Sequence, residues 1–284
     1  MAQDDSYRSW VGKTDSAVDF VDESRVERMY ATLDVSPPPS LVGSVVPILW
    51  HWMFFAPVAN FSDLGEDGHP KRGGFLPPVN LPRRMWAGGR LIFHKDLLVG
   101  TRVCRESTIK DIVLKEGRTG SMVFVTVSHV ISDEDGVILE EEHDIVYRDN
   151  EKIGTPSPRY KDARQTSDFS NSVTPDPVTL FRYSALTFNG HRIHYDRKYC
   201  LEQEGYPGLV FHGPLTATYL SKLLTDKHSG VKISTFSFRA VKPIFDNHSF
   251  DVHGERVGDD VYNLWTRDHA GHITMEASVT CVNK

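Results

Sequence analysis

The feature that most constrains the fold is a run of alternating apolar and polar residues at 122–131. Valines recur there at alternate positions, as in a strand with one buried face. The dipeptide Asp135-Gly136 follows, and it favours a two-residue turn because both of its residues tolerate a positive φ. The pattern therefore predicts long antiparallel strands within 85–148.

The same order of elements occurs twice along the chain. In the first half a helix is predicted at 25–33, where Ser24 and Glu27 fit a capping box, and long strands follow. In the second half a helix at 214–224 begins with proline and carries apolar residues at helical spacing. Strands are predicted after it at 232–241, 249–256, 260–267 and 272–282. The duplication indicates an α+β chain with two similar units, in each of which a sheet wraps a buried helix.

A polar stretch at 151–179 separates the two halves. It is rich in proline, serine and threonine and shows no periodicity, which is typical of a linker that crosses the surface. We therefore predict an N-terminal domain at 1–150, this linker, and a C-terminal domain at 180–284. A loop rich in glycine and proline is also predicted, at 65–80.

Residues 41–61 contain no charged side chain and are long enough to cross a bilayer. Pro47 and Pro57 interrupt the segment, however, and acidic residues flank it where positive residues normally anchor a spanning helix. We expect instead a buried, aromatic-rich helix that lines a pocket, with Trp50 and Trp52 as the candidates to meet a ligand. No membrane association is expected.

Charge and cysteine content exclude further classes of protein. The 32 Lys and Arg residues are outnumbered by 38 Asp and Glu residues, so the chain lacks an overall basic field and no nucleic-acid partner is expected. Cys104, Cys200 and Cys281 are far apart and form no disulfide framework. Together with an N-terminus that has no apolar signal core, they predict a reducing, cytoplasmic location.

The densest cluster of polar residues lies at 181–214 and includes His191, His194 and His212. His191 and His194 could supply two ligands to a metal ion, but no third ligand follows at a suitable spacing, so no metal site is predicted. The chain also has no nucleophile elbow, Walker loop or dinucleotide fingerprint.

Two stretches of this cluster, 189–196 (NGHRIHYD) and 206–214 (YPGLVFHGP), resemble the hydratase-2 (MaoC-like) signature of hot-dog enzymes. In that signature an Asp lies five residues before a His, and a His-Gly pair begins the central helix. Residues 81–89, with Phe93 and His94, resemble the partner half of the double hot-dog branch. That branch contains hydroxyacyl-thioester dehydratases and the mesaconyl-CoA and itaconyl-CoA hydratases. The resemblance implies a double hot-dog fold, two antiparallel sheets each wrapping a central helix, over nearly the whole chain.

The resemblance also implies catalytic roles. His194 would act as the base, and the backbone N–H of Gly213, at the start of a helix, would stabilise charge on the thioester oxygen. Asn189 stands where the signature has Asp, and because an amide cannot transfer a proton we expect it to orient the water. Cys200 departs from the signature too, and is expected to be a buried structural thiol rather than a nucleophile.

Several neighbouring residues are candidates for binding the substrate. Arg182 and Arg192 could each hold a free carboxylate in two places, or could brace the loop through salt bridges instead. His191 could touch the ligand or only shape the loop, and His212 could touch it or only turn the chain into the helix. Arg83 and Arg84 could meet the coenzyme phosphates or stay solvated.

Together these features predict a hydro-lyase acting on coenzyme A thioesters, with itaconyl-CoA or mesaconyl-CoA as the favoured substrates. The N-terminal half would shape the pocket and the C-terminal half would carry the chemistry. No cofactor beyond the coenzyme A of the substrate is expected, and a homodimer is the expected assembly. Two alternatives stay open: a broad 3-hydroxyacyl-thioester dehydratase, and a non-catalytic subunit that binds thioesters.

Overall fold

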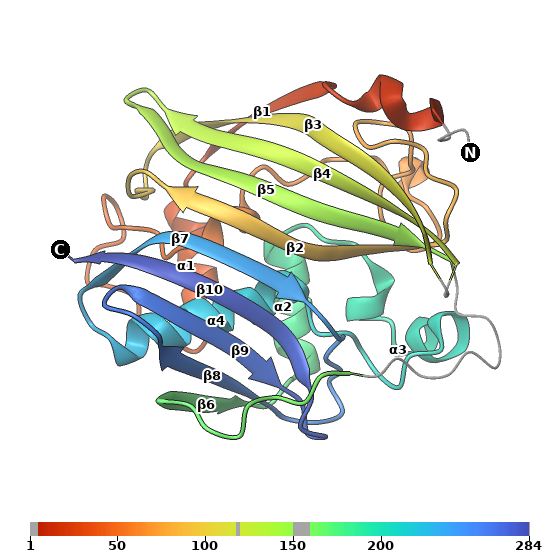
Figure 1. The fold of residues 1–284 in the computed structure, drawn as a ribbon. Coiled ribbons are helices and arrows are strands. Elements are labelled where there is room, and N and C mark those ends of the chain that lie inside the picture. The colour runs from red at the N-terminus through yellow and green to blue at the C-terminus, as the bar shows by residue number, and fades with distance from the viewer. Residues whose placement is uncertain (1–4, 118–119, 150–159, 284) are drawn as a thin grey trace.

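Antiparallel strands form one continuous curved sheet in the computed structural model, which describes residues 5–117, 120–149 and 160–283 (Figure 1). The strands lie in the order β1-β3-β4-β5-β2-β7-β10-β9-β8-β6. Those of the first half are β1 (Thr14–Phe20), β2 (Arg83–Phe93), β3 (Arg102–Gly117), β4 (Gly120–Asp133) and β5 (Gly136–Arg148). Those of the second half are β6 (Phe169–Val173), β7 (Val231–Ala240), β8 (Phe250–Arg256), β9 (Val261–Arg267) and β10 (Ile273–Asn283).

The two halves join where β2 pairs with β7. The paired residues run from Gly88 opposite Arg239 to Ile92 opposite Thr235. The two predicted sets of antiparallel strands are therefore confirmed. Hydrogen bonds between β2 and β7 join the two sets into a single sheet. The β4–β5 hairpin is confirmed as well, with its turn one residue earlier than predicted. Asp133 pairs with Gly136, which takes a φ of 117° that glycine adopts at little cost.

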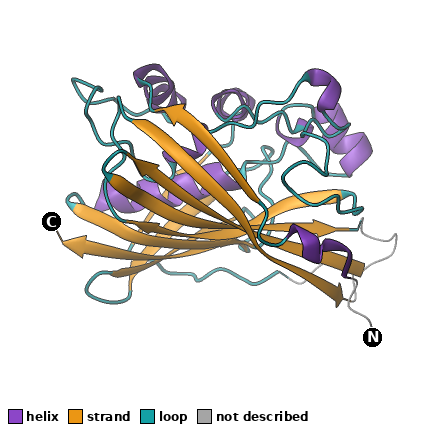
Figure 2. Cartoon of the chain, turned by 90° about the horizontal axis from the view of Figure 1, so that it is seen from above, coloured by secondary structure: helices purple, strands orange, loops and turns teal. Residues whose placement is uncertain are grey.

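The α-helices gather on one face of the sheet (Figure 2). The longest, α4 (Gly213–Lys227), packs on the strands of the second half through leucines such as Leu215 and Leu220. Helix α1 (Glu23–Thr32) packs against α2 (Pro177–Leu186), so the two halves also meet through their helices. The predicted capping box at α1 is wrong, because the Asp22 side chain caps the helix by accepting a hydrogen bond from the Arg25 N–H. A short α3 (Arg197–Tyr199) lies near the site described below.

The apolar segment 41–61 is not the helix that its composition suggests. It contains one 3₁₀ turn at Trp50–Met53 and the first residue of another at Phe61–Asp63. Leu49, just before the first turn, has a φ of 69°, which a regular helix cannot contain. The segment is buried as predicted, with Trp50 and Phe54 in the core. No helix in the described ranges is long and apolar enough to cross a membrane.

The predicted linker 151–179 is ordered over much of its length. Residues 150–159 lie outside the described part of the chain. After them, β6 pairs with β8 at the edge of the sheet, and α2 begins at Pro177 with Asp176 as its cap. The polar composition reflects an edge strand and a helix cap, both of which favour polar side chains.

Candidate active site

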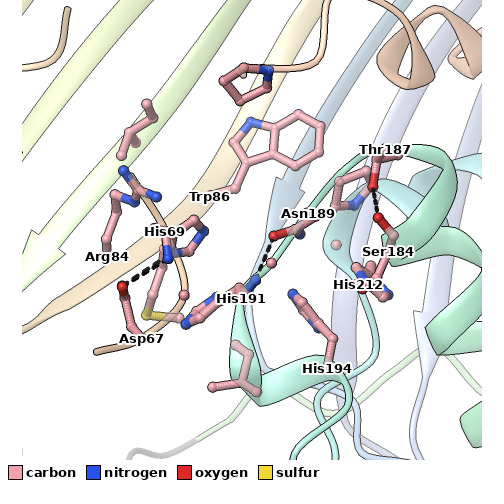
Figure 3. Close-up of a pocket in the computed structure, with 18 of the residues that line it drawn as sticks. Asp67, His69, Arg84, Trp86, Ser184, Thr187, Asn189, His191, His194 and His212 are labelled. Atoms are coloured by element: carbon pink, nitrogen blue, oxygen red, sulfur yellow. Dashed lines mark hydrogen bonds and ion pairs between the residues drawn. The ribbon is translucent and has the colours of Figure 1, made fainter. Parts of the chain in front are cut away.

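A cavity of about 1930 Å³ lies between the two halves, and residues from both halves line it. The first half contributes β2, β5 and the glycine-rich loop 65–80, which contains neither a helix nor a strand, as predicted. The second half contributes 189–191, Ile193, His194 and the first turn of α4. Figure 3 shows His69 and Arg84 on one side, and Asn189 and His194 on the other.

His194 ends a short 3₁₀ turn (Arg192–His194) and is 7% exposed. Its Nδ1 lies 2.8 Å from the carbonyl oxygen of Val210. A carbonyl can only accept, so Nδ1 carries the hydrogen and Nε2 keeps its lone pair. Burial lowers the pKa of His194 to about 4, although the bond to Val210 acts in the opposite direction. The side chain is therefore a neutral imidazole that can accept a proton.

His212 lies beside this ring. Its imidazole is stacked on that of His194, with ring centroids 3.7 Å apart, and its Nε2 is 2.9 Å from the Ser184 hydroxyl. Burial, together with the nearby His194, holds the pKa of His212 well below its ordinary value. Its Nδ1 has no hydrogen-bond partner among the described residues. His212 is the residue just before α4, so it turns the chain into the helix, as predicted, and also lines the cavity.

Asn189 and Gly213 line the same cavity. The Asn189 side-chain oxygen accepts a hydrogen bond from the His191 N–H at 3.0 Å, and its amide group donates none to the described residues. Gly213 is the first residue of α4, so its N–H has no acceptor within the helix. A β-carbon on Gly213 would lie 4.0 Å from the Trp86 ring, so the glycine faces Trp86. The sequence motif thus brings Asn189, His194 and Gly213 to one cavity.

Three of the predicted substrate-binding residues lie elsewhere. Arg182 is exposed on α2 and donates to the Ala31 carbonyl at 3.3 Å. Arg192 pairs with Asp196 at 2.8 Å and so braces the loop, which was the alternative considered for it. Trp50 packs in the core against Tyr30. None of the three lines the cavity, so the structure does not bring them together with Asn189, His194 and Gly213.

Trp52 and His191 do line the cavity. The Trp52 indole N–H donates to Glu141 at 2.7 Å, and Glu141 also contacts His51 and His143. Burial alone would raise the pKa of Glu141, but the two histidines hold it well below its ordinary value. This buried carboxylate was not predicted, because its partners come from separate segments of the first half.

Cys200 is a structural thiol, as expected. Its sulfur donates to the Ile193 carbonyl at 3.0 Å, and burial raises its pKa to about 11. A thiol with such a pKa is almost fully protonated at neutral pH and is a poor nucleophile.

The sequence pattern missed two residues of the first half, Asp67 and His69. His69 Nδ1 lies 3.0 Å from the Asp67 carboxylate, and both residues line the cavity. Burial lowers the pKa of His69, while the Asp67 hydrogen bond opposes this effect. The only sequence signal is an Asp-x-His triplet inside a loop of glycine and proline, which by itself predicts no site.

Asp67, His69 and His191 place three donor atoms within 4.8 Å of one another, a spacing that suits one metal ion. The carboxylate of Asp67 and the ring of His69 already satisfy each other through their hydrogen bond. We therefore interpret them as a carboxylate–imidazole pair, and the absence of a metal from the reaction stays a prediction.

Comparisons with known proteins point to one family. The family model for hydroxyacyl-thioester dehydratase type 2 matches residues 49–246. The chain is 43% identical over 274 residues to the mesaconyl-C(4)-CoA hydratase of Chloroflexus aurantiacus, covering 96% of this chain and 97% of that protein. It is 28% identical to the mitochondrial hydroxyacyl-thioester dehydratase type 2 of Schizosaccharomyces pombe, covering 87% and 90% of the two chains. A crystal structure of a MaoC-like dehydratase from Phytophthora capsici superposes with a TM-score of 0.73, at 10% identity over 96% of each chain, which confirms the predicted double hot-dog fold.

Proposed function

This chain belongs to the hydroxyacyl-thioester dehydratase type 2 family and is a hydro-lyase, and on that premise we propose that it adds water reversibly to an enoyl-CoA thioester. The observation that carries this proposal is the protonation state of the His194 side chain. Its Nδ1 is occupied by the Val210 carbonyl at 2.8 Å, which leaves the lone pair of Nε2 for chemistry. Its pKa of about 4 keeps this base unprotonated at neutral pH.

The proposed reaction assigns one task to each of three groups. The Asn189 amide holds a water molecule, and His194 Nε2 takes a proton from that water as its oxygen bonds to the β-carbon. The electrons of the double bond move toward the thioester, and the Gly213 N–H stabilises the charge on its oxygen. The α-carbon then receives a proton to complete the hydration. Dehydration follows the same steps in reverse.

We further propose a short dicarboxylic acyl group, mesaconyl or itaconyl, as the preferred substrate. The relative from Chloroflexus aurantiacus supports this choice through its name. Arg84 supports it chemically: it lines the cavity on β2 and is half-buried, and no described carboxylate forms an ion pair with it. Its charge contributes to lowering the pKa of both His69 and His191, and Arg84 lies beside His69 in the cavity (Figure 3). A guanidinium in this position could bind the free carboxylate in two places.

A direct assay tests the proposal. The purified chain is incubated with crotonyl-CoA, itaconyl-CoA and mesaconyl-CoA, and loss of the enoyl absorbance is followed. We expect hydration of the dicarboxylic esters to be the most efficient, and His194→Ala to lower turnover by about 10²–10⁴-fold with the fold intact. Preference for crotonyl-CoA would instead indicate a broad dehydratase. Tight binding without hydration would indicate the non-catalytic thioester-binding subunit.

The predicted homodimer is retained as part of this proposal. Size-exclusion chromatography with light scattering would measure the mass, and a mass of one chain would contradict the prediction. The reaction is also proposed to need no cofactor, which assays after exhaustive dialysis would test.

A further inference from the structure

The loop at 65–69 of the first half is hydrogen-bonded to the loop at 189–194 of the second half. The Arg192 N–H donates to the Asp67 carbonyl at 2.9 Å, and the Arg192 guanidinium donates to the Glu66 carbonyl at 3.1 Å. Gly68 faces Gly190 so closely that a β-carbon on Gly68 would overlap the Gly190 carbonyl oxygen. The position of residues 65–69 is therefore fixed relative to the residues that carry the chemistry.

Within this loop, Asp67 fixes both the backbone and the side chain of His69. One carboxylate oxygen accepts from the His69 backbone N–H and the other contacts Nδ1, both at 3.0 Å. The Asp67 hydrogen bond with His69 keeps the carboxylate pKa low despite burial, which by itself would raise it. An ionised carboxylate can only accept, so Nδ1 carries a hydrogen and Nε2 is the atom left for proton transfer.

This pair lies close to the proposed base. The His69 ring centroid is 4.1 Å from that of His191, and the His191 centroid is 5.5 Å from that of His194. All three rings line the same cavity (Figure 3). His69 and His194 are therefore both in ring contact with His191, and both line the cavity in which the acyl group would lie.

Hydration needs two proton transfers, one from the water and one to the α-carbon. Asn189 cannot make the second transfer, because an amide neither gives nor takes a proton at neutral pH. Resting on the function proposed above, we propose that His69, positioned by Asp67, is the second proton-transferring residue of this enzyme.

The step balances in both directions. Both rings are neutral before hydration, because burial lowers the pKa of each. His194 takes a proton from water as the C–O bond forms, and this proton passes through the water of the cavity to Nε2 of His69. His69 then gives it to the α-carbon, where the electron pair of the enolate forms the new C–H bond. In dehydration, neutral His69 takes the α-proton, the proton passes back to His194, and His194 gives it to the departing hydroxyl group. Asp67 is the positioning residue in both directions.

Chemical rescue gives a direct test. His69→Ala should lower turnover by about 10²–10⁴-fold with a smaller change in KM, and added imidazole should restore part of the rate. Asp67→Asn should lower turnover less, because the ring remains but loses its orienting charge. His94→Gln is the matched control, since His94 makes a similar 3.0 Å contact with Glu140 on an exposed surface. It should retain wild-type turnover.

Incorporation of solvent deuterium at the α-carbon measures the proposed proton transfer directly. The wild-type enzyme should incorporate solvent deuterium at the α-carbon of the hydrated ester, and His69→Ala should do so far more slowly while still binding the ester. Wild-type turnover in His69→Ala would overturn the inference, as would a loss of turnover that imidazole does not restore. The inference would also be overturned if a chelator abolished the activity of the wild-type enzyme and added zinc restored it. A wild-type enzyme that hydrates no enoyl-CoA would refute the proposed function itself, and the inference with it.

Discussion

The imidazole of His194 is stacked on that of His212, with centroids 3.7 Å apart and planes inclined by 18°. Two stacked rings in a buried site resist protonation, because a charge on either would be poorly solvated and would oppose a charge on the other. Burial lowers the pKa of His194 to about 4. A free histidine would lose its base form below about pH 6.5.

The activity should therefore lack an acid limb near neutrality. We expect kcat/KM for hydration to show no decline between about pH 7.5 and about pH 5.5, because His194 remains a neutral base throughout this range. Initial rates across the range, each checked for enzyme stability, would measure this. A decline centred near pH 6.5 would mean that His194 titrates normally or is not the base.

Asn189 offers a second test of the mechanism. Asn189→Asp should fold and remain active, because a carboxylate oxygen can still accept the hydrogen bond from the His191 N–H. Asn189→Ala removes both this bond and the donor to water, and should lower turnover more strongly. Steady-state rates with crotonyl-CoA and mesaconyl-CoA compare the two variants. Inactivity of a correctly folded Asn189→Asp variant would show that the amide donor itself is required.

Much of the fold could be predicted because its signals are local. Alternation and the Asp-Gly dipeptide mark the hairpin of the first half, and the predicted strands of the second half match β7 to β10. The joining of β2 to β7 could not be predicted, since it depends on pairing between segments far apart in sequence. The aromatic segment failed as a helix because composition does not show the positive φ of Leu49.

The site residues also divide into those that could be predicted from the sequence and those that could not. Asn189, His194 and Gly213 belong to one contiguous signature, so their meeting at one cavity could be expected. Arg182 lies outside the cavity because its position on α2 directs it to solvent, which its proximity in sequence to the cluster does not indicate. Asp67 and His69 reach the site only because the first half packs on the second.

Buried neutral histidines should make the protein sensitive to acid. In the unfolded chain a histidine protonates below about pH 6.5, whereas His194 in the fold does so only near pH 4. The unfolded state therefore binds more protons between these values, and stability is lost as the pH falls from about 6.5. His194 alone should lower the free energy of unfolding by about 2 kcal/mol between neutral pH and about pH 5. Urea unfolding at several pH values would measure this, and His194→Gln should show a shallower decline.

The contact between Gly68 and Gly190 predicts an effect of the loop on catalysis. Gly68→Ala should lower turnover at least about tenfold, because the new methyl group would displace the loop that carries Asp67 and His69. Gly12→Ala is the matched control: Gly12 has a φ of 84°, close to the 85° of Gly68, but no atom lies within 4 Å of its would-be β-carbon. Both variants carry the backbone strain of about 1 kcal/mol, so a difference in turnover isolates the contact. Equal turnover in the two variants would show that the loop position does not matter.

Arg84 tests which acyl group the cavity selects. Arg84→Gln should raise KM for mesaconyl-CoA by about 10–100-fold, the loss expected when charge-assisted hydrogen bonds of about 1.5–3 kcal/mol to a carboxylate are removed. The same substitution should leave crotonyl-CoA kinetics nearly unchanged, because that ester has no second carboxylate. Arg83→Gln is the control for loss of a neighbouring charge, since the Arg83 guanidinium instead donates to the Glu204 carbonyl at 3.0 Å. An equal rise in KM for both esters would assign Arg84 to the coenzyme rather than to the acyl group.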